Sequence, residues 1–192
     1  IVGSGGAGLS AAVTAAEAGN YKIVVLEKMP VIGGNTLRCA SAFNAADPER
    51  QKLLPMTDTL KDAVVKAINE KPANADHAKL MADVKAKYEA YLKSGSTTLF
   101  DCPEWHALQT YNGGDKVGHI PLIRTYAENV LDTLHWMQKH GTPVMDRVSQ
   151  GAGALWQRTH QVDAPAGTGL IEPLLKAANK DGVKIITGMR AQ

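Results

Sequence analysis

The stretch that decides the fold is IVGSGGAGLSAAVTAAEAGNYKIVVLEKMPVIGGN, residues 1–35. Residues 3–8, GSGGAG, fit the pattern G-x-G-x-x-G. A helix is predicted directly after this turn, over residues 9–18, and an apolar strand over residues 23–26. An acid, Glu27, closes that strand. This order of turn, helix, strand and acid predicts a βαβ unit of the kind that binds a dinucleotide.

The glycines of this turn have separate mechanical roles. Gly3 permits a tight turn after the first strand, Gly5 lets the backbone approach a pyrophosphate, and Gly8 allows helix and strand to pack closely. The helix that follows offers N–H groups and the positive end of its dipole to phosphates. Glu27 stands where a carboxylate accepts hydrogen bonds from ribose hydroxyls. The alternative is an ordinary βαβ turn with a solvated acid, but the combined context favours an adenine dinucleotide.

The residues after the acid favour one dinucleotide over another. The segment 33–36, Gly-Gly-Asn-Thr, follows Glu27 closely. In simple nicotinamide enzymes, the chain after this acid enters a helix without a glycine pair. A backbone that returns along the pyrophosphate towards a flavin ring suits such a pair, so the segment favours FAD over NAD. Glu27 has no arginine beside it, which argues against a 2′-phosphate, although the neighbouring Lys28 leaves that ligand open.

Composition excludes several other classes of function. The chain has 192 residues, 44% of them hydrophobic, and a formal net charge of +2. This charge is too small to indicate nucleic-acid binding, and no apolar run is long enough to cross a membrane. The two cysteines, Cys39 and Cys102, lack metal or haem spacing, so we expect free thiols and no metal site, and the compartment stays open. Only Ile1 and Val2 precede the glycine turn, so we expect a fragment that starts inside its first strand.

The rest of the chain is predicted to alternate helices with irregular segments. Residues 37–46 are small and poorly periodic, and we expect either a loop whose N–H groups approach a flat ring or a tightly packed loop. Residues 96–120 are expected to be irregular, because proline and glycines interrupt them. Their aromatic and histidine side chains either line a ligand cleft or pin the loop to the core. Helices are predicted over residues 57–70, 76–93, 121–140 and 170–180, and a strand that rejoins the sheet over residues 183–187.

Several side chains are assigned from their local pattern. His77 is expected at the surface or as a cap in the first turn of its helix. Arg158 and His160 have two interpretations that the sequence leaves open. They are either neighbours of a glycine turn close to a flavin, or a surface ion-pair former and a loop hydrogen-bonder. The helix over residues 121–140 is expected to bury an apolar stripe of Leu122, Tyr126, Val130, Leu134 and Met137.

With these segments in view, the chain resembles the flavoprotein reductases of the soluble fumarate reductase and flavocytochrome c group, together with urocanate and related enoate reductases. The resemblance implies an α/β fold, a Rossmann-like FAD-binding domain with a parallel sheet and inserted helices, as a fragment of a larger flavoprotein. Residues 1–192 would form a partial FAD-binding domain. Its parts would be a dinucleotide-binding segment (1–47), a helical insertion (48–150) and a flavin-side loop, helix and strand (151–192). The residues that carry the resemblance are 3–8, Glu27-Lys28, 31–36, 44–46 and 158–160.

The resemblance also implies which residues hold the cofactor. It implies that the turn ending at Gly8 grips FAD, that Glu27 contacts the ribose, and that Asn35 and Thr36 lie near the pyrophosphate. Ser41 and Ala42 stand where relatives carry a glycine pair against the flavin, a departure that leaves the shape of the substrate pocket open. The expected cofactor-binding residues are Gly3, Gly5, Gly6, Ala7, Gly8, Glu27, Lys28, Gly33, Gly34, Asn35, Thr36, Ser41 and Ala42.

The implied activity is an FAD-dependent oxidoreductase acting on CH–CH bonds, in which reduced flavin delivers hydride to the C=C bond of a small unsaturated carboxylate such as fumarate. A haem or flavin domain or protein would donate the electrons. The catalytic motifs of such enzymes lie beyond Gln192, so we assign no catalytic residue. One alternative is an FAD-binding or electron-transfer module without its own complete active site. Another is a flavin dehydrogenase of a different substrate class, such as a ketosteroid dehydrogenase. The resemblance leans slightly towards a periplasmic rather than a cytoplasmic protein.

Overall fold

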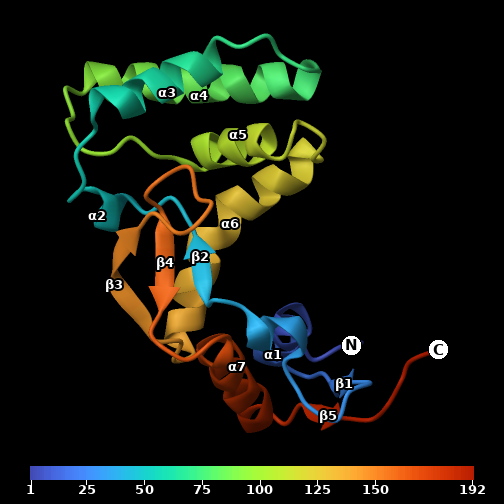
Figure 1. Cartoon of the computed structure of the whole chain (residues 1–192). Coiled ribbons are helices and arrows are strands. Elements are labelled where there is room, and N and C mark those ends of the chain that lie inside the picture. The colour runs from blue at the N-terminus through green and yellow to red at the C-terminus, as the bar shows by residue number, and fades with distance from the viewer. The chain divides into compact units, whose positions relative to one another are not determined.

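A computed structural model describes residues 1–192 (Figure 1). The chain divides into two compact units, each described by itself below. Unit 1 comprises residues 1–42, 134–145 and 161–192, and unit 2 comprises residues 43–133 and 146–160.

Unit 1 is built on a parallel pair of strands. β1 (Val24–Leu26) pairs with β5 (Lys184–Ile186), and Val25 lies opposite Ile185. On the other side of β1, Val2 forms a parallel bridge with Leu26. The predicted parallel sheet, and the return of a last strand to it, are therefore confirmed.

One helix covers the strands of unit 1, and a second helix packs against it. α1 (Gly6–Glu17) packs against β1 and against α7 (Thr168–Lys180). α1 buries Leu9 and Val13 completely, because residues four apart lie on one face of a helix. Both helices were predicted, but α1 begins at Gly6 rather than at residue 9, because the glycine turn itself supplies its first turn. A 3₁₀ helix, η1 (Gly34–Arg38), follows the glycine pair.

Unit 2 is mainly helical. α3 (Asp58–Ile68) packs against α4 (Ala75–Lys93), which packs against α5 (Pro103–Gly113) (Figure 1). α2 (Pro48–Gln51) and most of α6 (Ile120–Lys139) also belong to this unit. A three-stranded sheet with the order β2-β4-β3 contributes most of its residues to unit 2, from β2 (Ala42–Asn44), β4 (Thr159–Val162) and β3 (Val144–Ser149).

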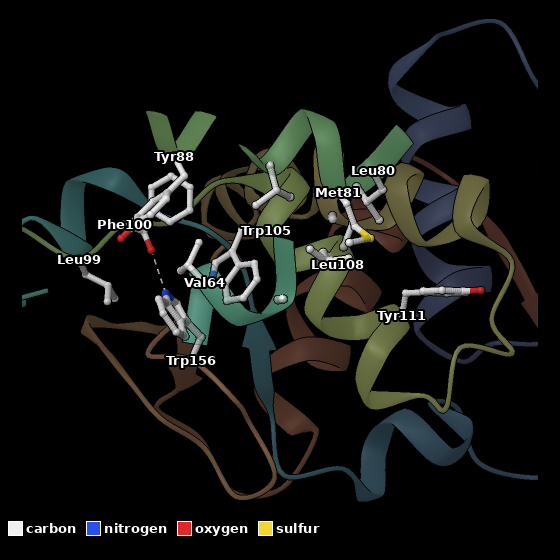
Figure 2. Close-up of a cluster of buried hydrophobic side chains, with 14 of the residues drawn as sticks. Val64, Leu80, Met81, Tyr88, Leu99, Phe100, Trp105, Leu108, Tyr111 and Trp156 are labelled. Atoms are coloured by element: carbon white, nitrogen blue, oxygen red, sulfur yellow. Dashed lines mark hydrogen bonds between the residues drawn. The ribbon is translucent and has the colours of Figure 1, made fainter. Parts of the chain in front are cut away.

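The core of unit 2 is aromatic (Figure 2). Trp105 and Trp156 meet edge to face with ring centroids 5.3 Å apart. The indole Nε1–H of Trp156 donates a hydrogen bond of 3.0 Å to the carbonyl oxygen of Phe100. Leu80 and Leu108 are completely buried beside them. An indole whose polar atom is satisfied stabilises a core without the cost of an unpaired donor.

The helices predicted over residues 57–70 and 76–93 are confirmed as α3 and α4. Each begins at a polar cap, since the side chain of Thr57 accepts from the N–H of Leu60 and that of Asn74 accepts from the N–H of His77. These caps satisfy N–H groups that have no partner inside the helix.

Three local predictions are wrong. Residues 96–120 are not irregular throughout, because α5 begins at Pro103, where a helix needs no N–H donor, and the Sγ of Cys102 caps it. His77 does not lie at the surface, because it is completely buried, although its Nδ1 does act at the start of α4 by accepting a 3.1 Å hydrogen bond from the N–H of Ala73. In α6, Leu122 and Tyr126 are 69% and 46% exposed, whereas the rest of the predicted stripe, Val130, Leu134 and Met137, is buried.

The loop predicted over residues 37–46 and the one predicted at the start of residues 151–192 also contain regular structure. β2 lies in the first and β4 in the second, and the two strands are neighbours in the sheet. Short strands with mixed side chains have no alternating pattern that a sequence would reveal.

Candidate functional site

The glycine turn has the geometry that its sequence predicts at two of its positions. Gly3 has φ of +92°, a conformation that other residues rarely adopt. A Cβ atom on Gly8 would lie 1.9 Å from the carbonyl oxygen of Gly3, so only glycine fits there. On Gly5, by contrast, a Cβ would meet no atom of the protein closer than 3.8 Å. The fold therefore requires Gly3 and Gly8, whereas the absence of a side chain at Gly5 leaves the backbone open.

The helix behind this turn keeps donors available. Gly5 is the N-cap of α1 and has no side chain with which to cap the helix. The N–H of Gly6 donates a 3.1 Å hydrogen bond to Oγ1 of Thr36. The N-cap residue itself takes none of the other N–H groups of the first turn, and such groups can be offered to an anion, with the helix dipole adding to the attraction.

Glu27 is held by the glycine turn itself. Its Oε2 accepts hydrogen bonds from the N–H of Ser4 at 2.8 Å and from the hydroxyl of Ser4 at 2.7 Å. Its Oε1 accepts from the N–H of Met29 at 2.8 Å. The hydrogen bond from Met29 and the two from Ser4 favour the charged carboxylate and lower the pKa of Glu27 to about 2. The motif predicts the position of Glu27 but not its partner Ser4, whose hydroxyl lies in the glycine turn.

A cavity of 720 Å³ in unit 1 brings several predicted residues together. Its lining also includes two cations that the sequence analysis missed, Arg38 and Arg190. The predicted cofactor-binding residues that line it are Gly3, Gly5, Glu27, Lys28, Gly34 and Asn35. The predicted residues that do not line it are Gly6, Ala7, Gly8, Gly33, Thr36, Ser41 and Ala42.

The glycine pair returns to the turn. Gly33 and Gly34 both have positive φ, +116° and +54°. Gly33 forms a parallel bridge with Gly5, and its N–H donates a 3.1 Å hydrogen bond to the carbonyl oxygen of Ser4. The backbone after the acid thus runs beside the glycine turn, as the pair indicated.

Ser41 and Ala42 have different environments. Ser41 is completely buried with φ of +55°, and its hydroxyl donates to the carbonyl oxygen of Ala166. Ala42 is exposed in β2. The hydroxyl of Ser41 is therefore used within the protein, at the loop that leads into α7.

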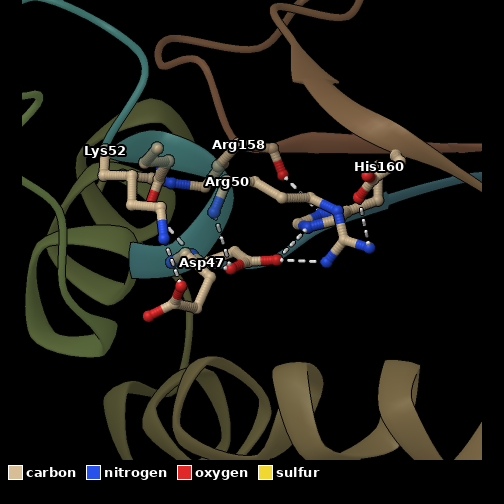
Figure 3. Close-up of polar contacts among 8 residues, drawn as sticks. Asp47, Arg50, Lys52, Arg158 and His160 are labelled. Atoms are coloured by element: carbon tan, nitrogen blue, oxygen red, sulfur yellow. Dashed lines mark hydrogen bonds and ion pairs between the residues drawn. The ribbon is translucent and has the colours of Figure 1, made fainter.

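Arg158 and His160 belong to a buried polar network in unit 2. The guanidinium of Arg158 binds both carboxylate oxygens of Asp101, at 2.9 and 2.7 Å. His160 Nε2 lies 3.0 Å from Oδ2 of Asp47 (Figure 3). The same oxygen accepts a 2.8 Å hydrogen bond from Nη1 of Arg50. The interpretation of Arg158 as a surface ion-pair former is therefore wrong, because its side chain is only 5% exposed. His160 does form the hydrogen bond that was expected of it. It forms that bond from β4 and not from a loop.

Asp47 remains charged in this network. Burial raises the pKa of its carboxyl group, but hydrogen bonds from His160 and Arg50 outweigh that effect and hold the pKa below its ordinary value. Its Oδ1 also accepts from the N–H groups of Glu49 and Arg50, so the same carboxylate caps α2.

The residues of α5 divide between the two roles considered for them. Trp105 and Tyr111 are buried in the core of unit 2. His106 lines a second cavity, of 310 Å³, together with Gln109 and Arg158. Burial, and after it the charge of Arg158, lower the pKa of His106 to about 3, so this imidazole is neutral near pH 7.

Other kinds of site have little support. Nowhere do three or more histidine, cysteine or acidic side chains gather in an arrangement suited to a metal ion. None of the helices combines the length and the apolar character that crossing a membrane requires. Both cysteines are free thiols, and burial raises the pKa of Cys102 to about 12.

Comparison with known proteins adds to this geometry. Residues 1–93 match the family model of the FAD binding domain. NADH:acrylate oxidoreductase from Vibrio harveyi is 34% identical over the whole of this chain, which covers 20% of that protein. Fumarate reductase (cytochrome) from Shewanella frigidimarina is 28% identical over 88% of this chain, which covers 22% of that protein. The chain thus spans about a fifth of the length of these relatives.

A solved structure has the same fold. The open conformation of a flavocytochrome c3 fumarate reductase superposes with a TM-score of 0.66 at 23% identity, over 97% of this chain and 26% of that one. These matches confirm the predicted fold class and indicate FAD as the cofactor.

The residues present fit the adenosine diphosphate end of that cofactor. The glycine turn is open at Gly5, the N-cap residue of α1 has no side chain, and Glu27 lies in the wall of the same cavity as Gly5. Lys28, Arg38 and Arg190 add positive charge to that wall. A cradle of backbone donors beside cations suits phosphates, and a carboxylate suits a sugar hydroxyl.

Proposed function

We propose that the chain belongs to the FAD-dependent flavoproteins of the fumarate reductase and enoate reductase group and is the FAD-binding part of a reductase of unsaturated carboxylates. The observation that carries the proposal is the 720 Å³ cavity, in which the open turn at Gly5 and the carboxylate of Glu27 share one wall. When bound and reduced, FAD would supply hydride for the C=C bond of a fumarate-like or acrylate-like substrate.

The chain's own residues would bind and orient the cofactor. The backbone of Gly5 and the first turn of α1, including Gly6, Ala7 and Gly8, would hold the pyrophosphate, with Asn35 and Thr36 nearby. Glu27 would bind the adenosine ribose, and Lys28 would face the phosphates. Gly3 would shape the turn. Gly33 and Gly34 would carry the backbone back along the cofactor, and Ser41 and Ala42 would approach the flavin side.

Three parts of the chain would together bind the cofactor. Residues 1–47 would bind the dinucleotide, residues 48–150 would form a helical insertion, and residues 151–192 would provide a loop, helix and strand on the flavin side. The substrate would be a small unsaturated carboxylate, and a haem or flavin domain or protein would supply electrons. The residues that protonate the substrate would lie outside this chain.

Reoxidation of the flavin tests this function. We expect the full-length protein to be yellow, to bleach with dithionite, and to regain its colour on addition of fumarate or acrylate. Succinate and propionate, which lack the C=C bond, are the matched controls and should leave the flavin reduced. A protein that binds FAD but that no unsaturated carboxylate reoxidises would reject the reductase and favour an electron-transfer module or another flavin dehydrogenase.

A further inference from the structure

We propose that Glu27 accepts a hydrogen bond from only one of the two ribose hydroxyls, through Oε1, and that Ser4 is the residue that imposes this limit. The inference rests on the proposed placement of the cofactor and deepens it, because it assigns a positioning role to a residue that does not line the cavity.

Counting acceptor sites on the carboxylate leads to this conclusion. Each oxygen of a carboxylate accepts about two hydrogen bonds. Oε2 of Glu27 already accepts two, from the N–H of Ser4 at 2.8 Å and from its hydroxyl at 2.7 Å. Oε1 accepts one, from the N–H of Met29 at 2.8 Å. One acceptor position therefore remains, and it is on Oε1.

The surroundings of Ser4 keep Oε2 occupied. Ser4 is completely buried, so its hydroxyl cannot replace the hydrogen bond to Glu27 with one to bulk water. Its carbonyl oxygen accepts the N–H of Gly33 at 3.1 Å, and its Oγ lies 3.4 Å from the same nitrogen. With that N–H on one side, the hydroxyl proton is directed to Glu27. A ribose hydroxyl would have to displace two short hydrogen bonds to reach Oε2.

The consequence is a form of selectivity. A carboxylate with both oxygens free has enough acceptor positions for the 2′- and 3′-hydroxyls together, and the loss of either hydroxyl would then weaken binding. Here only one hydroxyl of the pair would gain the charge-assisted bond, and the other would depend on water. Glu27 thus recognises the adenosine ribose through a single hydroxyl group.

Displacement of FAD by deoxynucleotides tests the inference. ADP, 2′-deoxy-ADP and 3′-deoxy-ADP are titrated against the FAD-loaded full chain, and released FAD is followed by fluorescence. We expect one deoxy analogue to bind about 10- to 100-fold more weakly than ADP, the range for a hydrogen bond to a charged group. The other should bind within about 3-fold of ADP, since it loses no such bond.

Variants separate the role of Ser4 from a general loss of structure. Ser4→Ala frees one acceptor position on Oε2, so the difference between the two deoxy analogues should shrink. Glu27→Ala should abolish that difference. Ser10→Ala, in α1 and away from the cavity wall, is the matched control and should leave all three affinities unchanged.

Each result decides between specific alternatives. Equal and large losses for both deoxy analogues in the unmodified protein would overturn the inference without any variant. A difference that persists unchanged in Ser4→Ala would overturn the role of Ser4. Failure of ADP to displace FAD would instead reject the proposed placement of the cofactor, and the single-hydroxyl inference with it.

Discussion

Arg158 and Asp101 form a buried bidentate ion pair across 57 residues of sequence, with nitrogen–oxygen distances of 2.9 and 2.7 Å. The side chains are 5% and 1% exposed. Nε2 of Gln51 donates to the same carboxylate at 2.5 Å and to the carbonyl oxygen of Gln157 at 3.0 Å. The pair thus connects α2, the segment before α5 and the segment before β4 within unit 2.

Removing the charge of Asp101 should be costly. We expect Asp101→Asn to lower the free energy of unfolding by about 3–5 kcal/mol, because Arg158 would stay buried without its counter-charge. Urea unfolding measures the change. Asp58→Asn breaks an ion pair with Lys61 whose acid is 95% exposed, and this control should change stability little. A loss below about 1 kcal/mol for Asp101→Asn would show that Arg158 finds other partners.

Two glycines of the turn should respond differently to alanine. Gly8→Ala forces a Cβ against the carbonyl oxygen of Gly3 and should cost about 1–3 kcal/mol of stability, as overpacking typically does. Gly5→Ala meets no close protein atom, so its unfolding midpoint should stay near that of the original chain, while its affinity for FAD falls. Thermal unfolding and FAD titration together distinguish the two. Full FAD affinity in Gly5→Ala would place the pyrophosphate elsewhere.

The carboxylate of Glu27 should make the free energy of unfolding depend on pH in the acid range. Its pKa is about 2 in the folded chain against an ordinary 4.5, so the folded state holds the proton less tightly than the unfolded state. Its stabilising effect is therefore complete above pH 4.5 and is lost as the pH falls towards 2. We expect the stability difference between the original chain and Glu27→Gln to shrink over that interval. A difference that stays constant in guanidinium unfolding from pH 6 to about 2.5 would contradict the hydrogen-bonding pattern at Glu27.

His106 should contribute a second acid dependence at higher pH. Its pKa falls from 6.5 to about 3 on folding, because of burial and then of Arg158. Below pH 6.5 the unfolded chain binds a proton there that the folded chain refuses, so stability declines until the pH approaches 3. Replacement by Gln removes this decline. We expect the stability of His106→Gln to vary less between pH 7 and about 4 than that of the original chain, and an NMR titration of the imidazole in that interval would refute the shift.

Sequence pattern predicts the parts of this fold that local chemistry determines. The glycine turn, the apolar run before Glu27 and the helix start at Thr57 are contiguous signals, and the elements they predict are present. α5 was missed because Pro103 was taken as an interruption, although proline is favoured in the first turn of a helix.

The missing parts of the site depend on contacts between distant residues. Ser4 meets Glu27 across 23 residues, and Asp47 meets His160 across 113. No spacing rule relates such pairs, since their approach is set by how strands and helices pack. Arg190 reaches the cavity for the same reason, because it follows the strand that pairs with β1. The sequence therefore predicts the residues of the local motif. It does not predict the distant residues that hold them in place.

The pairing of β1 with β5 has a consequence for biosynthesis. β1 leaves the ribosome long before its partner Lys184–Ile186, which follows every other element described above. The aromatic core of unit 2 draws only on residues between Met56 and Trp156, so a nascent chain can assemble it while one edge of β1 still waits unpaired. Contacts that close such long loops form slowly. The nucleotide cradle is thus completed only after the aromatic core of unit 2 has been translated, and a translating cell has to shield an open strand until then.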